Sequence, residues 1–223
     1  METPSDSGQL FRIGVSFGTV VSGQSPDRPV RPLPDACGEP SGNKRTDRRS
    51  ARTRRLLMGA LMDLMLVKRY DAITVQEITD RADVGRSTFY AHFTDKDALL
   101  ADGARQMIGA LAAGDAAHVS LPLLRHIGER SELYVVMSRG RGLPLFLDAL
   151  HRELTADYAG RLAARASGPS AVPVPLLAAM VSSMLLTALR TWLEAGATEP
   201  PETVDRAFRT AADAAIRAGL APA

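Results

Sequence analysis

Residues 82–100 read ADVGRSTFYAHFTDKDALL, and this stretch decides the fold predicted for the chain. Gly85 separates two short segments, and Phe89 and Phe93 stand four residues apart, which places them on one side of a helix. The polar residues between and around the two phenylalanines would then face outwards. A helix that only packs in a core has no need of so many hydroxyl and imidazole groups, so we expect its outer side to contact a partner.

The residues on either side of this stretch predict further helices. Upstream, apolar residues recur at intervals of three and four and indicate a helix over about 50–69. Thr74 followed by Glu77 is a capping box, which predicts a second, short helix that ends before Gly85. Gly85 is expected to take the positive φ of the tight turn, and Thr94 to open the next helix. Two short helices joined by such a turn form a helix-turn-helix, whose last helix fits the major groove of DNA.

Basic residues are concentrated just before the predicted helix-turn-helix. The whole chain has a formal net charge of +2, but residues 44–55, KRTDRRSARTRR, hold seven basic side chains and one acidic side chain. This concentration predicts an arm that binds DNA phosphates, and a solvated charge run is the alternative. Residues 1–43 are rich in Gly, Pro, Ser and Asp without a sustained period, so we expect a disordered extension there.

The segment from about Arg48 to Leu100 resembles the DNA-binding domain of the TetR family of transcriptional repressors. It carries ITVQEITDRADVGRSTFYAHFTDKDALL: a threonine that opens the second helix, the glycine turn, STFYAHF, and a lysine followed by two leucines. The resemblance implies base and phosphate contacts by the helix after the turn, and phosphate contacts by Thr74 and Lys96. A half-buried Tyr90 and a His92 without a DNA role are the alternatives. The predicted DNA-binding residues are Arg52, Thr74, Arg86, Ser87, Thr88, Tyr90, His92 and Lys96.

The rest of the chain has helical patterns throughout, and aromatic residues make up only 5% of it. Further helices are expected near 118–129, 131–139, 143–166, 173–196 and 201–219, with breaks at Gly- and Pro-containing segments. We therefore predict an all-α protein with three parts: the extension (1–43), the helix-turn-helix domain with its basic arm (44–99), and a helical domain (100–223). The family resemblance implies that the last part binds a ligand and forms a homodimer through the last two helices.

A ligand cavity would lie among the helices from 118 to 196, because Met and aromatic side chains there suit an adaptable apolar pocket. Such side chains more often belong to the core of a protein, which is the alternative for each of them. The candidates are His126, Tyr134, Met137, Phe146, Leu150, Tyr158, Met180, Met184 and Trp192. The histidines lack partners at metal-ligand spacing, and the chain has a single cysteine, so we expect neither a metal nor a cofactor.

These patterns predict a dimeric, ligand-responsive transcriptional regulator, a repressor rather than an activator. It would bind a palindromic operator in double-stranded DNA and be released by a small-molecule inducer. One alternative is a protein of the same fold that serves chromosome organisation or division without an inducer. Another is a ligand-binding or interaction protein that has lost DNA recognition. The sequence shows no catalytic motif, so we do not expect an enzyme. It has no run of eighteen apolar residues, so we do not expect a membrane span, and we expect a cytoplasmic location.

Overall fold

The computed structural model describes residues 41–113, 119–166 and 168–222. Within these ranges the chain forms α-helices, one 3₁₀ helix (η1, Tyr70–Ala72), and one isolated β-bridge between Ser170 and Pro222. The prediction of an all-α fold is confirmed. The helices are α1 (Ser41–Val67), α2 (Val75–Ala82), α3 (Arg86–His92), α4 (Lys96–Ala112), α5 (Ser120–Gly128), α6 (Ser131–Met137), α7 (Gly142–Arg165), α8 (Val174–Glu194) and α9 (Pro201–Gly219).

The first helix starts earlier than the sequence pattern suggested. It begins at Ser41, so residues 41–43 of the predicted extension and the whole basic segment 44–55 are helical. Arginine is the commonest residue of this segment, and its helix propensity is among the highest. The apolar period that marked the helix starts only at about Leu57, because the earlier turns carry charged side chains. Residues 1–40, with Cys37, lie outside the described residues.

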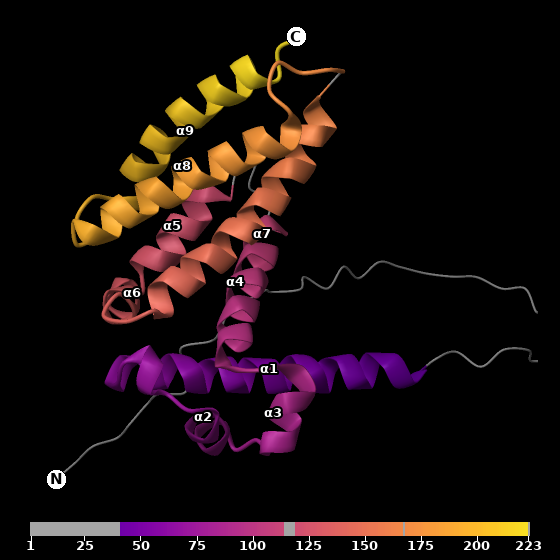
Figure 1. The fold of residues 1–223 in the computed structure, drawn as a ribbon, viewed down its shortest axis with the longest axis vertical. Coiled ribbons are helices and arrows are strands. Elements are labelled where there is room, and N and C mark those ends of the chain that lie inside the picture. The colour runs from indigo at the N-terminus through magenta and orange to yellow at the C-terminus, as the bar shows by residue number, and fades with distance from the viewer. Residues whose placement is uncertain (1–40, 114–118, 167, 223) are drawn as a thin grey trace, which may run out of the picture. The chain divides into compact units, whose positions relative to one another are not determined.

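A stripe of apolar residues on α1 forms the buried side of this helix in the N-terminal domain. Leu57, Leu61 and Met65 recur every four residues, and none is more than 1% exposed. They belong to one hydrophobic cluster with Ile78 of α2 and Phe89 of α3. Figure 1 shows α2 and α3 below α1, with α4 leading away from them into the rest of the helical domain. The apolar positions that predicted an amphipathic helix are therefore the positions that are buried in α1.

The turn between α2 and α3 differs in detail from the prediction. The left-handed residue is Asp83, with φ of 51°, whereas Gly85 is extended, with φ of −63° and ψ of 145°, and is the N-cap of α3. Aspartate tolerates the left-handed region better than most residues, so the turn does not need its glycine there. The next N-cap is also one residue later than predicted, at Asp95, whose carboxylate accepts a hydrogen bond from the Ala98 amide.

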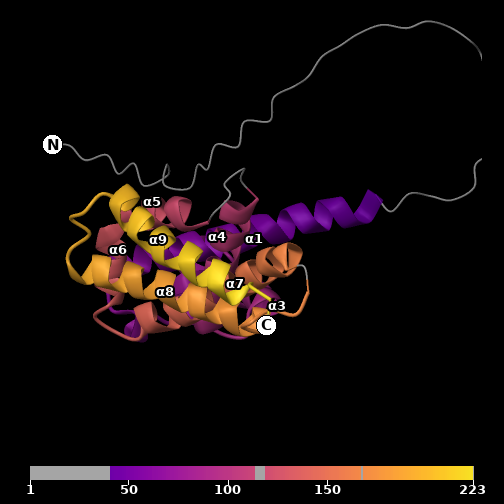
Figure 2. The ribbon, with the colours of Figure 1, turned by 90° about the horizontal axis from the view of Figure 1, so that it is seen from above.

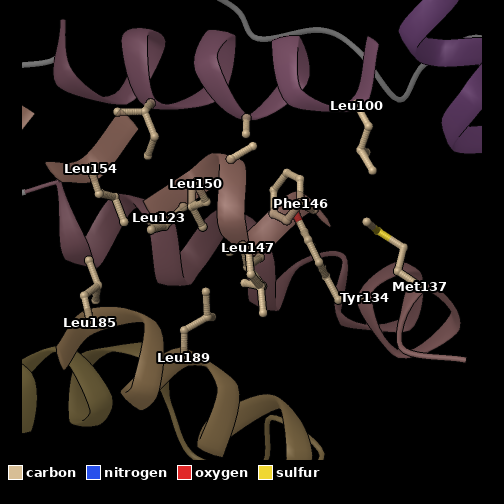
Figure 3. Packing of buried hydrophobic residues seen from close by; sticks show 14 of the residues in the cluster. Leu100, Leu123, Tyr134, Met137, Phe146, Leu147, Leu150, Leu154, Leu185 and Leu189 are labelled. Atoms are coloured by element: carbon tan, nitrogen blue, oxygen red, sulfur yellow. The ribbon is translucent and has the colours of Figure 1, made fainter. Parts of the chain in front are cut away.

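The helices from α4 to α9 form the second part of the fold. The packing pairs are α4 with α7, α7 with α8, α8 with α9, and α5 with α9, and Figure 2 shows α8 and α9 lying together. Figure 3 shows buried side chains of this packing, among them Leu100 of α4, Leu123 of α5 and Leu150 of α7, together with side chains of α6 and α8. The predicted helix boundaries in this region agree with the structure to within about two residues.

Among the described residues, one helix, α8, is long and apolar enough to cross a membrane by length and composition alone. It has 21 residues, and 44% of its most apolar window is buried inside the protein. Buried helices of soluble proteins meet the same criterion. Its side chains Leu177, Val181 and Leu185 are at most 1% exposed, so one face of α8 is a packed face.

The turn geometry leads to a prediction about Gly85. A Cβ added there would lie 3.8 Å from the hydroxyl oxygens of Ser87 and Thr88, which is ordinary van der Waals contact. Gly85→Ala should therefore change the free energy of unfolding by less than about 0.5 kcal/mol in chemical denaturation. The matched variant Asp83→Ala places alanine in the left-handed region and should cost about 1 kcal/mol. The opposite ranking of the two variants would contradict the observed turn.

Candidate nucleic-acid interface

The start of α2 is fixed by the predicted capping box. The Glu77 amide donates a hydrogen bond to the Thr74 hydroxyl, at 3.3 Å between nitrogen and oxygen, and the Glu77 carboxylate accepts one from the Thr74 amide at 2.9 Å. Lys68 forms an ion pair with the same carboxylate. These hydrogen bonds, the one from Lys68 foremost, lower the pKa of Glu77 to about 2. Thr74 thus caps α2 and remains exposed at the surface.

The recognition-type helix α3 has one buried and one exposed side. Phe89 is 0% exposed and Phe93 is 6% exposed. Their rings lie 5.8 Å apart, centre to centre. The opposite side of the helix carries the exposed residues Arg86, Ser87, Thr88, Tyr90 and Ala91. This side therefore offers hydroxyl groups, a guanidinium, a phenol and a methyl group, which are groups that can contact base edges in a major groove.

Tyr90 is a large aromatic residue held at the surface. It is 51% exposed, and its ring meets the ring of Phe89 edge-on, at 5.4 Å between centres and 84° between planes. The Arg86 guanidinium lies over the Tyr90 ring at 6.0 Å. These contacts restrict the phenol without burying it. His92, at the end of α3, is only half-buried and lies beside Phe93.

Lys96 occupies an unexpected position for a phosphate-binding residue. Its ammonium donates hydrogen bonds to the carbonyls of Tyr70 at 2.8 Å, Asp71 at 3.1 Å and Ile73 at 2.6 Å. It also lies 4.7 Å from the centre of the Tyr70 ring, and burial lowers its pKa. An ammonium has three N–H donors, and all three have partners here. A phosphate contact would require Lys96 to release at least one of these carbonyls.

The basic segment divides into solvent-facing and internal side chains. Arg52 is exposed, as a phosphate contact requires. Arg54 instead forms an ion pair with the buried Asp102 of α4, at 3.5 Å, and lies 5.9 Å from the centre of the Phe93 ring. The buried carboxylate of Asp102 also accepts hydrogen bonds from Arg105 and Gln106. At least one cation of the segment therefore holds α1 to α4 rather than facing a partner.

A cluster of charges that the sequence reasoning missed lies beside this domain. Arg141, between α6 and α7, forms ion pairs with Asp71 of η1 at 3.1 Å and with Asp97 of α4 at 2.9 Å. The Tyr70 hydroxyl donates a hydrogen bond to Asp97 at 2.6 Å. Burial and this hydrogen bond raise the pKa of Tyr70. The only sequence signal was the stretch RGRG at 139–142, which predicted a break between helices and not a contact.

The predicted ligand residues do not gather around one cavity. A cleft of about 230 Å³ is lined by Tyr134, Val135 and Ser138 of α6, by the first two turns of α7, and by Arg190, Leu193 and Glu194 of α8. Tyr134 alone of the nine candidates lines this cleft, and burial raises its pKa. Met137, Phe146, Leu150, Tyr158 and Trp192 are buried in the core, Met184 and His126 are half-buried, and Met180 is 47% exposed.

Two of the buried candidates differ in how their polar atoms are satisfied. Trp192 donates a hydrogen bond from its indole nitrogen to the Glu199 carbonyl at 2.8 Å, so it serves the connection between α8 and α9. The Tyr158 hydroxyl has no hydrogen-bond partner among the described residues. His126 lies 3.2 Å from Arg130, and burial together with that guanidinium lowers the pKa of His126. Within the described ranges, no group of three or more His, Cys, Asp or Glu side chains could hold a metal ion.

Comparison with known proteins identifies the N-terminal domain. The family model described as "Bacterial regulatory proteins, tetR family" matches residues 57–102. This range runs from the buried stripe of α1 through the whole helix-turn-helix to the second turn of α4. Residues 57–102 therefore carry the N-terminal domain of the TetR family. The resemblance seen in the sequence is therefore confirmed.

Relatives and solved structures agree with this assignment. The uncharacterized HTH-type transcriptional regulator YxbF of Bacillus subtilis is 27% identical over 184 residues, which are 77% of this chain and 47% of the relative. YdeS of the same organism, described in the same words, is 37% identical over 60 residues, 27% of this chain and 30% of the relative. The matched part of the chain thus spans less than half the length of these two relatives.

Two solved structures show the same fold. A TetR transcriptional regulator from Streptococcus agalactiae has a TM-score of 0.53 at 24% identity, over 76% of this chain and 98% of that one. The dihydroxyacetone kinase operon activator DhaS has a TM-score of 0.53 at 17% identity, over 75% and 97%. The likeness extends through the helices after α4, so the second part of the chain has the fold of a TetR regulator too.

The contacts of Lys96 can be tested by removing its charge. Lys96→Met keeps the length of the side chain but leaves three carbonyls without their donor, and it should lower the free energy of unfolding by about 1–3 kcal/mol in urea denaturation. Arg69→Met, in an exposed residue of the same connection, is the matched control and should change it by less than about 0.5 kcal/mol. Equal stability of the two variants, with DNA binding lost only in Lys96→Met, would instead indicate a phosphate contact.

Proposed function

We propose that this TetR-family protein is a DNA-binding transcriptional regulator that contacts its operator with α3. The observation that supports this most strongly is the division of α3 into a buried and an exposed side. Phe89 and Phe93 hold the helix to the domain, and the donors and acceptors of Ser87, Thr88 and Tyr90 remain available to a partner. A helix presented in this way can enter a major groove with its N-terminal residues against base edges.

The charges around α3 fit a duplex as the partner. Arg52 and Arg55 are exposed on α1, and Arg86 is exposed at the start of α3. Thr74 stands at the N-terminal end of α2, where backbone amides and the helix dipole favour a phosphate. Because these groups neutralise phosphates, DNA binding should weaken steeply as salt concentration rises. A protein that had lost DNA recognition would have no reason to keep this set exposed together.

Substitutions on α3 and α1 test the proposal against a matched control. Tyr90→Ala should weaken binding to an operator selected from random-sequence duplexes by about tenfold, equivalent to about 1.4 kcal/mol. Arg52→Ala should lower the slope of log affinity against log salt concentration by about one, because one phosphate contact is lost. Fluorescence anisotropy at several salt concentrations measures both.

Arg152→Ala, an exposed arginine of α7, is the control and should leave both affinity and slope unchanged. If Tyr90→Ala and Arg52→Ala behave like Arg152→Ala, α3 and α1 do not form the DNA-binding surface.

The proposed regulator works as a homodimer through α8 and α9. Leu176 and Met180, one turn apart on the outer side of α8, are 55% and 47% exposed. The outer side of α9 carries small exposed residues that permit close approach of a second copy; these are Ala207, Ala211, Ala214 and Ala218. A twofold axis through this surface would pair the two α3 helices for a palindromic operator.

A charge placed on the outer side of α8 tests the dimer. Met180→Asp should convert the protein to a monomer in sedimentation velocity, because it buries a carboxylate in an apolar interface without a partner. Val67→Asp, in an exposed residue of α1, should leave the dimer intact. A dimer that persists in Met180→Asp at micromolar concentration would refute an interface through this surface.

The effector site of this cytoplasmic repressor is proposed to be the cleft between α6, α7 and α8. Its apolar lining includes Tyr134, Leu147 and Leu193, and its polar lining includes the carboxylates of Asp148 and Glu194. Neither carboxylate forms an ion pair with a described residue, and Arg190 is the only cation among the lining residues. The cleft volume of about 230 Å³ is below the range of ~300–1,000 Å³ for drug-sized ligands. A small organic cation with an apolar body fits these features best, and its binding would release the operator.

Small aromatic ions of opposite charge test the chemistry of the cleft. Benzyltrimethylammonium should bind more tightly than benzenesulfonate in calorimetric titrations, and Asp148→Asn should weaken the cation about threefold to tenfold because a carboxylate in the cleft is neutralised. Glu132→Gln changes an exposed carboxylate of α6 that does not line the cleft, and it should have no effect. Preference for the anion, or equal effects of the two substitutions, would argue against this site.

A further inference from the structure

The connection between α6 and α7, residues 138–141, contacts the DNA-binding domain, and the cleft lies next to this connection. We call this connection the corner. Arg141, the residue before α7, binds Asp71 through its Nε at 3.1 Å and Asp97 through its Nη2 at 2.9 Å. Its backbone amide also donates to the Asp71 carboxylate, at 3.4 Å. One residue of the helical domain thus holds two elements of the DNA-binding domain, η1 and the first turn of α4.

The glycines on both sides of Arg141 allow this close approach. A Cβ added to Gly140 would lie 2.5 Å from a carboxylate oxygen of Asp71, and one added to Gly142 would lie 3.0 Å from the Cβ of Tyr70. The first of these distances is shorter than real Cβ contacts. The backbone of the corner therefore lies directly against η1, and a change in the position of the corner must change the contact.

The other side of the contact leads to the helix-turn-helix. Lys96 ties the start of α4 to the carbonyls of Tyr70, Asp71 and Ile73, and Ile73 directly precedes the N-cap of α2. The Tyr70 hydroxyl joins the same unit through Asp97. Hydrogen bonds thus join the α1–α2 connection to the start of α4, and α2 and α3 are the two helices that lie between these segments in the chain.

The cleft adjoins the corner on the helical-domain side. Leu143 and Pro144, the second and third residues of α7, line it, and so does Ser138 at the end of α6. A molecule in the cleft therefore touches the two helix ends that Arg141 connects. We propose that Arg141 is the positioning residue that transmits occupancy of this cleft to the DNA-binding domain; this inference rests on the proposed effector site.

The weakness of the contact supports a regulatory role over a purely structural one. The side chains of Arg141, Asp71 and Asp97 are 56%, 42% and 32% exposed, and exposed ion pairs add little stability. A contact of this kind can form and break without unfolding either part, whereas the burial of core side chains cannot be undone so cheaply. The contact is nevertheless specific, because the Arg141 guanidinium must be placed and oriented to meet two carboxylates on different elements.

A larger side chain substituted into the cleft tests the proposal without a known ligand or operator. Val135 lines the cleft and is 43% exposed, so Val135→Trp should fill it and Val135→Ala should widen it. In the otherwise wild-type protein, Val135→Trp should change the amide hydrogen-exchange rates of residues 70–73 and 95–100 by about threefold or more. Val135→Ala should change them less.

Val135→Trp is then combined with Arg141→Gln. The matched control combines Val135→Trp with Arg139→Gln, which changes an exposed arginine two residues away. The response at residues 70–73 and 95–100 should disappear in Arg141→Gln, persist in Arg139→Gln, and be partly retained in Arg141→Lys. Circular dichroism checks that each variant is folded, and Asp97→Asn provides a second way to cut the contact if Arg141→Gln is not.

An equal response in the Arg141→Gln and Arg139→Gln proteins would overturn the proposal, and so would the absence of any response to Val135→Trp in the wild-type background. The readout does not involve DNA. If the exchange response depends on Arg141 but Tyr90→Ala leaves DNA binding unchanged, the proposed reading surface fails and the coupling stands. If Tyr90→Ala weakens binding but the exchange response is independent of Arg141, the coupling fails and the reading surface stands.

Discussion

The burial of Phe89 and Phe93 is the constraint on which the candidate interface depends. Helix α3 has seven residues, and a helix of that length is not stable in water on its own. Burying a phenylalanine stabilises a fold by roughly 1.5–3 kcal/mol, so these two side chains contribute strongly to holding α3 in place. They also fix its rotation. With Phe89 at 0% exposure, helix geometry leaves Ser87, Thr88 and Tyr90 no position except the surface.

Charged groups then determine how this domain is joined to the rest of the fold. Asp102 is buried and bound by Arg54, and Lys96 satisfies three carbonyls between α1 and α2. Both contacts use a cation that, from its place near the helix-turn-helix, could equally have faced DNA. The cations that remain at the surface, Arg52 and Arg86 among them, are a subset of the basic residues in this part of the sequence. Local charge density alone therefore overstates the number of cations that are free to meet a partner.

The helical domain uses apolar residues for two different purposes. On α8, Leu177, Val181 and Leu185 are buried against neighbouring helices, while Leu176 and Met180 lie on the outside. An apolar pattern around most of a helix predicts cover on more than one side, and the described residues of a single chain leave Leu176 and Met180 uncovered. The same excess of apolar residues explains why α8 has the composition of a membrane-spanning helix. It is also the reason that a second copy is the partner proposed for this surface.

The sequence by itself determined the all-α fold, the helix-turn-helix and the outward residues of α3, because these follow from apolar spacing and capping within about four residues along the chain. Periodicity also placed the later helices. It could not place the positive φ of the turn, since both Asp83 and Gly85 can supply it, and it could not give Lys96 its partners, which lie more than twenty residues away. The contact of Arg141 with Asp71 and Asp97, and the cleft beside it, were decided only by the tertiary structure. Nothing local to RGRG specifies which surface it meets; that depends on how α4 and α7 pack, which is a property of the whole core.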